Sequence, residues 1–232
     1  MNYFELINKC LVELNYKPVN NFKELIKNEH KKIKNIINII NTEICRSEKW
    51  DFLLRKTELT LPKNTGELQN TINGRIALIL IDNTPYEYFE DFKKFLTNTQ
   101  PLNTYSSFND KLLFPIFNEE KVITVVYYTE NNALDSQQNE KLYLEKETDE
   151  TIIPEIYAEP ILVYGTCMRL KGNPQHVKFS YWLSMYKESV TNLKSKCHID
   201  IDTAPTIKLY RYWQKKQEVF SFPLLRFTLA EI

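Results

Sequence analysis

The chain has 232 residues, of which 43% are hydrophobic and 26% are charged, a composition typical of an ordinary soluble globular protein with one or two domains. Its 30 basic and 30 acidic side chains give a formal net charge of +0, which argues against a protein that grips nucleic acid through the phosphates. The 4 glycines form neither a G-x-G-x-x-G motif nor a P-loop, so glycine-rich phosphate sites are not expected.

The N-terminal region has two segments with helical periodicity. Residues 3–15 carry apolar side chains at steps of three and four, which predicts a short amphipathic helix that ends before Pro18. Asn21 is expected to be the N-cap of a long second helix, with Glu24 as its capping partner, and this helix should extend to about Arg46. Its polar face carries lysines that either line a DNA channel or simply face solvent: Lys27, Lys31 and Lys34.

Residues 50–150 change to the period of β-strands. Strands are expected at residues 57–61, 75–81, 111–117 and 121–129. The last two are expected to pair as a hairpin through a turn at residues 118–120. Residues 85–96 are aromatic and acidic and predict a short helix, and the polar residues 130–150 predict a loop with a short strand at residues 142–144.

A helical hairpin is expected over residues 153–196. Pro154 suits a first helical turn, and Gly172-Asn173-Pro174 separates two apolar runs with helical spacing. Candidate strands follow at residues 199–209 and 219–229.

These elements together predict an α+β fold. A bundle of four helices, from residues 1–49 and 151–197, is expected to carry an inserted antiparallel β domain, residues 50–150. Residues 198–232 are expected to form an extended C-terminal arm.

The four cysteines are far apart and contain no C-x-x-C pair, which argues against a zinc ribbon. Cys10, Cys45 and Cys167 fall within helical patterns and are expected to be buried free thiols, in a protein that folds in a reducing compartment. The N-terminus lacks the pattern of a signal peptide, and no apolar stretch is long enough to span a bilayer.

Aromatic side chains are concentrated in the C-terminal segment. One interpretation is an arm that docks on a partner, because tyrosine and tryptophan often anchor the centre of an interface. The other is a terminal hairpin that packs on the β domain of the same chain. The candidate partner-binding residues are Tyr210, Tyr212, Trp213, Phe220, Phe222 and Phe227.

Few residues suggest catalysis or metal binding. His198, Asp200 and Asp202 alternate along one predicted strand face and could in principle offer ligands to a metal. A polar, solvent-facing edge is the preferred interpretation, because the sequence offers no other ligand cluster and His30 and His176 lie on separate predicted helices. Three histidines without a G-x-S-x-G elbow give little support for a Ser-His-Asp hydrolase. The sequence therefore predicts no catalytic residues, no metal site and no cofactor.

Three segments, taken in order, carry a resemblance to a known family. The second helix ends in Trp50-Asp51-Phe52 before the first strand, residues 124–128 end a strand in two tyrosines, and Ile153-Pro154-Glu155-Ile156-Tyr157 opens a helical hairpin with a glycine–proline break. This order resembles the head-to-tail connector, or adaptor, proteins of tailed bacteriophages, which include the tail tubular and tail accessory proteins of short-tailed phages.

The resemblance implies a structural virion protein without enzymatic activity. It would be made in the host cytoplasm and form a ring, of about twelve copies, at the head–tail junction. Its partners would be copies of itself, the portal protein, and the next tail ring or tail tube protein, with double-stranded DNA passing through without sequence-specific binding. The alternatives are a tail ring further from the portal and, in another class, a phage hydrolytic or nucleic-acid-processing enzyme.

Overall fold

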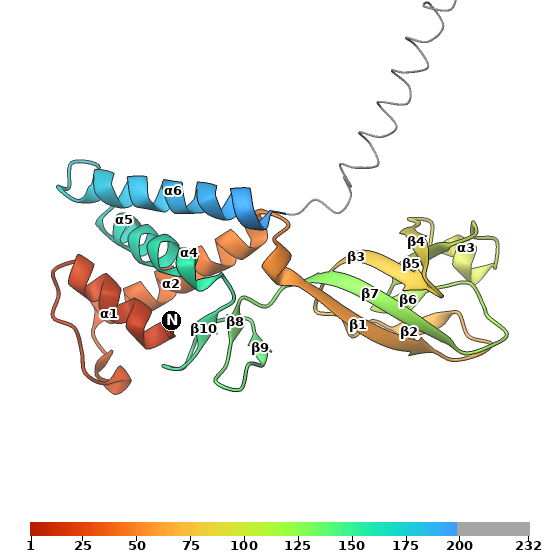
Figure 1. The fold of residues 1–232 in the computed structure, drawn as a ribbon. Helices are drawn as coiled ribbons and strands as arrows, with labels where there is room; N and C mark the ends of the chain where they lie inside the picture. The colour runs from red at the N-terminus through yellow and green to blue at the C-terminus, as the bar shows by residue number, and fades with distance from the viewer. Residues whose placement is uncertain (199–232) are drawn as a thin grey trace, which may run out of the picture. The chain divides into compact units, whose positions relative to one another are not determined.

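The computed structural model describes residues 1–198, which form helices and two β-sheets (Figure 1). The predictions that concern residues 199–232, including the strands at residues 199–209 and 219–229 and most of the arm, lie outside the described residues.

The predicted fold class, a four-helix bundle with an inserted antiparallel β domain, is wrong. The described chain is a mixed α/β structure whose main sheet has seven strands and is nearly closed, like a barrel. Its strand order is β1-β7-β3-β4-β5-β6-β2, and β4 and β5 run parallel. The sheet also encloses a hydrophobic core of its own, which includes Leu61, Ile79, Phe114 and Ile123. It is therefore a principal layer of the fold.

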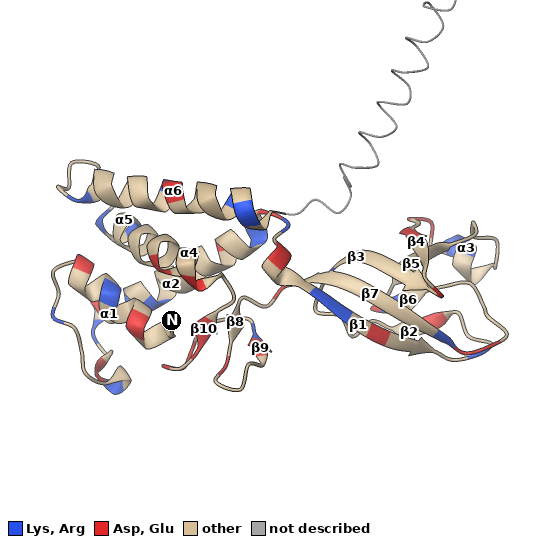
Figure 2. Cartoon of the chain, in the orientation of Figure 1, with Lys and Arg blue, Asp and Glu red and all other residues tan. Residues whose placement is uncertain are grey.

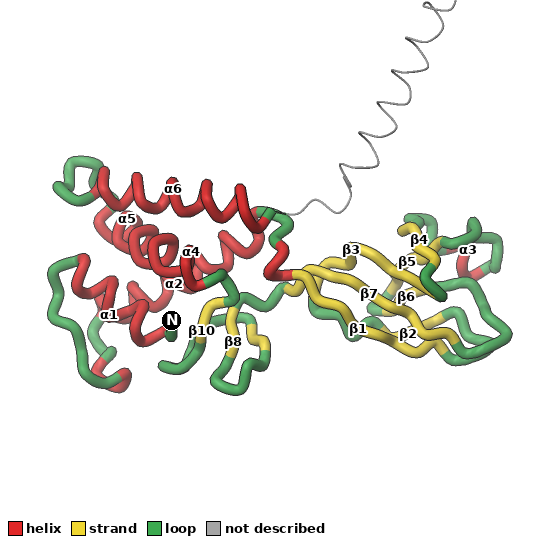
Figure 3. Tube along the Cα trace, in the orientation of Figure 1, coloured by secondary structure: helices red, strands yellow, loops and turns green. Residues whose placement is uncertain are grey.

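The strands of this sheet lie between residues 54 and 129 (Figure 3). They are β1 (Leu54–Leu61), β2 (Glu67–Gln69), β3 (Gly74–Ile81), β4 (Thr84–Tyr88), β5 (Thr104–Phe108), β6 (Lys111–Leu113) and β7 (Lys121–Thr129). A short helix, α3 (Lys93–Leu96), separates β4 from β5. The predicted helix at residues 85–96 is therefore wrong in its first half, which forms β4.

The predicted hairpin between residues 111–117 and 121–129 is also wrong. Strand β7 pairs antiparallel with β1, from Leu54 opposite Tyr128 to Leu61 opposite Lys121, and with β3 on its other side. Strand β6 pairs instead with β5 and β2. Periodicity identified the strands, but an apolar central strand such as β7 requires two neighbours, and periodicity does not say which they are.

A second, three-stranded sheet comes from the segment that was expected to be a polar loop. Its strands are β8 (Ala133–Leu134), β9 (Glu140–Lys141) and β10 (Glu150–Thr151), in the order β10-β8-β9. The predicted strand at residues 142–144 is displaced, since β9 ends just before it.

The two N-terminal helices are α1 (Tyr3–Glu13) and α2 (Asn28–Ser47). Helix α1 begins with a capping box, in which the Asn2 side chain accepts a hydrogen bond from Glu5 N and the Glu5 side chain accepts one from Asn2 N. The predicted capping role of Asn21 is wrong for the long helix, because Asn21 caps a separate 3₁₀ turn at Phe22–Glu24. The long helix therefore starts at Asn28.

The helix–break–helix pattern predicted over residues 153–196 is confirmed. The first half comprises α4 (Glu155–Glu159), a π-helical turn (Pro160–Tyr164) and α5 (Gly165–Lys171), and the second half is α6 (Phe179–Cys197). Pro160 has no N–H to donate, which fits the local change in hydrogen-bond register. Gly172 ends α5 in the left-handed region, with φ of 43°.

The helices share a second hydrophobic core. The fully buried members include Leu6, Ile37, Leu162 and Trp182 from α1, α2, the π-helical turn and α6. The prediction of buried free thiols is confirmed for Cys10, Cys45 and Cys167, and Cys197 is buried as well.

Candidate functional site

Between residues 1 and 198, no group of three or more His, Cys, Asp or Glu side chains is placed to hold a metal ion. None of the helices in this part of the chain is long and apolar enough to cross a membrane. His198 lies beside Glu48, with 3.6 Å between its Nδ1 and a carboxylate oxygen, while Asp200 and Asp202 lie outside the described residues.

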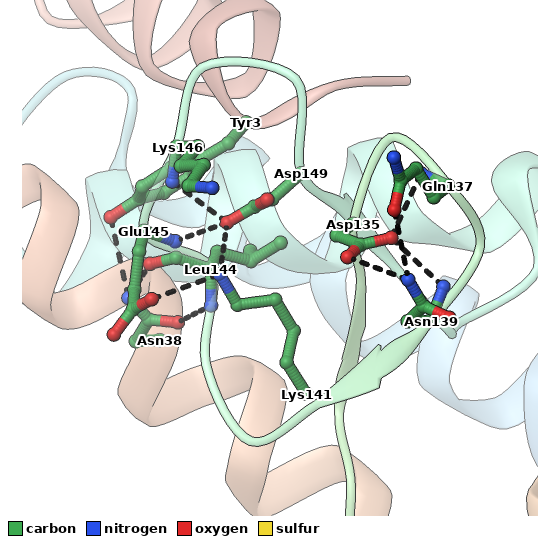
Figure 4. Close-up of polar contacts among 10 residues, drawn as sticks. All are labelled: Tyr3, Asn38, Asp135, Gln137, Asn139, Lys141, Leu144, Glu145, Lys146 and Asp149. Atoms are coloured by element: carbon green, nitrogen blue, oxygen red, sulfur yellow. Dashed lines mark hydrogen bonds and ion pairs between the residues drawn. The ribbon is translucent and has the colours of Figure 1, made fainter.

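A candidate site among the described residues is a groove beside α2. One wall is a stripe of α2, and the other is the loop that follows β9. Asn38 of α2 joins the two walls, because its side chain donates a hydrogen bond to Leu144 O and accepts one from Leu144 N, both at 2.9 Å (Figure 4). The Asn38 amide thereby makes the two backbone hydrogen bonds that a neighbouring β-strand could make to Leu144.

A buried carboxylate shapes the loop itself. Asp149 Oδ2 accepts hydrogen bonds from Glu145 N and Lys146 N, each at 2.7 Å, and from Lys141 Nζ at 2.9 Å (Figure 4). Burial alone would raise the pKa of Asp149, but these donors outweigh it and hold the pKa below the ordinary value. The peptide oxygen of Asp149 also accepts a hydrogen bond from Tyr3 N, which ties the loop to the start of α1.

A second polar contact fixes the small sheet to the same helix. Asn41 is almost fully buried on α2 and donates a hydrogen bond to Asn132 O at 2.8 Å, while Thr151 Oγ1 donates to Asn41 Oδ1 at 2.6 Å. Helix α2 therefore positions both the loop and the small sheet with polar side chains. Unpaired, these buried groups would each carry a desolvation penalty.

The resulting groove has a volume of about 500 Å³. Ile39 of α2 and Tyr143 of the loop line it and are each close to half exposed. Its charged lining residues are Glu43, which is paired with Arg169, and Glu145, which is paired with Lys141. The groove is therefore a partly apolar surface with acidic side chains and no basic ones.

The predicted channel-facing lysines lie at or near the start of α2. Lys27 is its N-cap residue and Lys31 is exposed. Lys34 is half-buried, with its Nζ 3.9 Å from the centre of the Phe22 ring, and burial lowers its pKa. In the view of Figure 2, basic and acidic residues are interspersed along the described helices and strands. A role of these three lysines in a DNA channel stays a prediction.

The predicted arm residues cannot be placed, because all of them lie outside the described residues. They are Tyr210, Tyr212, Trp213, Phe220, Phe222 and Phe227.

The groove was missed in the sequence because its key residues look like ordinary polar side chains. Asn38 and Asn41 lie on a long helix, where polar residues usually face solvent, and Asp149 lies in a strongly acidic segment. One available signal was the abundance of Asn, Thr and Asp in residues 130–151, since these side chains readily bond to backbone groups.

Comparisons with known proteins add no assignment. No model of a known protein family matches the chain, and no curated protein matches it significantly.

Proposed function

We propose that the protein is a structural component of a tailed-bacteriophage virion, which forms a ring that joins the portal vertex to the tail and continues the DNA channel. The observation that carries the proposal is the junction at Trp50-Asp51-Phe52, where the chain passes from α2 into β1. The resemblance to head-to-tail connectors depends on a junction of this kind after the second helix.

The junction is rigidly built. Trp50 is fully buried, its Nε1 donates a hydrogen bond to Ile44 O at 2.6 Å, and its ring stacks on Phe52 at 5.6 Å between centroids. His198, at the end of α6, forms an isolated antiparallel bridge with Trp50. The segments before and after this point are therefore held together. A ring subunit that keeps two layers of the virion in a fixed relation would require such a junction.

The surface of the described residues also supports assembly as the role. Several large apolar side chains are strongly exposed, among them Ile26, Ile156 and Val177. Isolated exposed apolar residues are common, but such residues at several separate places suit a subunit that contacts neighbours on different faces. The proposed partners are further copies of the chain, the portal protein and the next ring or tube of the tail, with DNA passing through without sequence-specific contact.

The test is binding to the portal protein from the same genome. Full-length protein should co-sediment with portal rings. A variant that lacks residues 204–232 should keep the far-ultraviolet circular dichroism of a folded protein but lose most of this binding, because the aromatic arm is the proposed anchor. Binding to isolated tail rings without binding to the portal would move the protein further down the tail. Failure to bind either would overturn the proposal.

A further inference from the structure

The loop between α5 and α6 holds one apolar side chain out into solvent. Val177 is 93% exposed, although its loop is well fixed by short-range hydrogen bonds. Gln175 N donates to Asn173 Oδ1 and His176 N donates to Asn173 O, each at 2.9 Å, and Lys178 N donates to His176 Nδ1 at 3.2 Å. The loop would therefore lose little conformational freedom when Val177 contacts a partner.

Contacts with the helices fix the base of this loop. The His176 ring stacks on Trp182 of α6, with 5.1 Å between ring centroids and 19° between ring planes. Lys178 Nζ donates to Glu13 O of α1 at 3.2 Å, and Trp182 Nε1 donates to the Glu13 carboxylate at 3.1 Å. The loop is thus attached to α1 and α6, whereas the groove lies between α2 and the loop after β9.

The loop and the groove are complementary in character. Residues 171–178 contain two lysines and a histidine but no acidic residue, and the groove is lined by Glu43 and Glu145 but no basic residue. Lys178 is also paired with Glu13 of α1, with 3.5 Å between its Nζ and a carboxylate oxygen. Both carboxylates are already paired within the chain, yet both remain largely exposed, so their charge still acts on an approaching cation. The groove volume of about 500 Å³ readily accommodates a valine side chain against Ile39 and Tyr143.

We infer that Val177 of one copy inserts into the Ile39–Tyr143 groove of a second copy of this chain. Such a contact joins two different surfaces, so every subunit can repeat it with the next one, as a cyclic ring requires. The inference rests on the proposed ring and specifies one of its subunit contacts. Apolar burial of Val177 supplies the attraction, and the charges of the loop and the groove orient it.

Disulfide cross-linking between two differently tagged full-length variants tests the contact. Val177→Cys and Ile39→Cys chains are mixed under ring-forming conditions and oxidised mildly, while the native thiols among the described residues stay buried. The mixture should give a covalent dimer with one chain of each kind, because a disulfide forms only between closely apposed cysteines. The yield of this mixed dimer should be at least about tenfold higher than the yield of covalent dimer from either variant oxidised alone.

Leu102→Cys is the matched control, because Leu102 is 91% exposed and lies in the connection between α3 and β5. Mixed with Ile39→Cys, it should give only background dimer. In a second test, Val177→Asp should lower ring formation by about tenfold or more, as expected for an anchor residue, and Leu102→Asp should not. Both sites are exposed, so either variant should fold.

The outcomes separate the two proposals. If wild-type rings form but Val177→Cys cross-links to Ile39→Cys no better than Leu102→Cys does, the contact is wrong and the ring proposal stands. Cross-linking mainly between two Val177→Cys chains would also overturn the contact, since it would indicate a symmetric interface. If the wild type forms no rings, alone or with the portal protein, both proposals fail.

Discussion

Asn38 and Leu144 are 106 residues apart in the sequence and are joined by a reciprocal pair of hydrogen bonds, each 2.9 Å long. Both bonds come from one side-chain amide, which satisfies the N–H and the C=O of a single loop residue. Leu144 is almost fully buried, so its peptide groups cannot easily turn to water instead. This pair fixes the loop to α2 and thereby forms the groove proposed above as a subunit contact.

Replacing Asn38 by alanine should therefore destabilise the protein. The variant leaves the N–H and C=O of Leu144 without their partner, and an unpaired buried polar group costs roughly 1–3 kcal/mol. Chemical denaturation should show a lower free energy of unfolding by about 2 kcal/mol. Asn35→Ala, at an exposed position on the same face of α2, is the control and should change it by less than about 0.5 kcal/mol. Equal effects of the two variants would contradict this account of the loop.

Asp149 should make stability depend on acid pH. Its folded-state pKa lies below the ordinary value of 3.8, so its contribution is fully present above that value and is lost as the pH falls through the folded-state pKa. Glu140 behaves in the same way relative to 4.5, because hydrogen bonds from Thr129, Arg55 and Asn131 outweigh the effect of burial on its pKa. Unfolding free energy should therefore decline as the pH is lowered below about 4.5.

Asp149→Asn isolates one part of this effect. The variant should be less stable at pH 7, because a buried ionic partner of Lys141 is lost, and its stability should decline less steeply below pH 3.8. Glu58→Gln alters an exposed carboxylate and should keep the wild-type pH profile. A wild-type slope in Asp149→Asn would show that Asp149 is not ionised in the way described. Denaturant titrations at several pH values provide the measurement.

Arg55 and Glu140 form an ion pair between β1 and β9, thereby linking the large sheet to the small one. Both side chains are less than one-third exposed, and Arg55 also donates to Phe52 O and Leu54 O. Arg55→Met should lower the free energy of unfolding by roughly 1–3 kcal/mol, because a hydrogen bond to a charged group is lost. A double-mutant cycle with Glu140→Gln should show coupling between the two sites.

The exposed pair Lys56–Glu58 in the same strand is the control for this prediction. Its side chains are about 60% exposed, and its coupling energy should stay below about 1 kcal/mol. Equal coupling in both cycles would mean that the link between the sheets contributes no more than a surface ion pair.

Gly74 allows β3 to approach β7 closely. A Cβ atom at this position would lie 2.1 Å from Tyr128 O, which is a backbone atom and cannot move aside as a side chain does. Gly74→Ala should therefore separate the first residues of β3 from β7 and cost about 3 kcal/mol of stability. Gly172→Ala meets nothing closer than 3.7 Å, and its cost, from the left-handed φ alone, should be about 1 kcal/mol. A milder effect at Gly74 than at Gly172 would contradict the strand packing described.

Local sequence patterns predicted the elements better than their arrangement. The spacing of apolar residues predicted α1, β3, β7 and α6 closely, because each of these elements buries one face or is buried throughout. The same patterns did not show that β7 would lie between β1 and β3, since strand pairing is a non-local property. The predicted helix at residues 85–96 is wrong at Tyr86 and Tyr88, because both lie in β4, which pairs with β3 and β5.

The candidate site was predictable only in part. The buried thiols followed from the positions of Cys10, Cys45 and Cys167 on apolar helix faces. The groove could not be predicted, because it depends on Asn38 meeting Leu144 and on Asp149 accepting hydrogen bonds from its own loop. Such contacts are made by polar side chains that, in the sequence alone, are indistinguishable from solvent-exposed ones.

Electron microscopy of portal rings, with and without the purified full-length protein, tests the central proposal most directly. The account predicts an additional ring-shaped layer on the portal, with a channel continuous through both layers, and this layer should be absent from portal rings alone. Portal rings that remain unchanged at saturating protein concentration would contradict the proposed role at the head–tail junction.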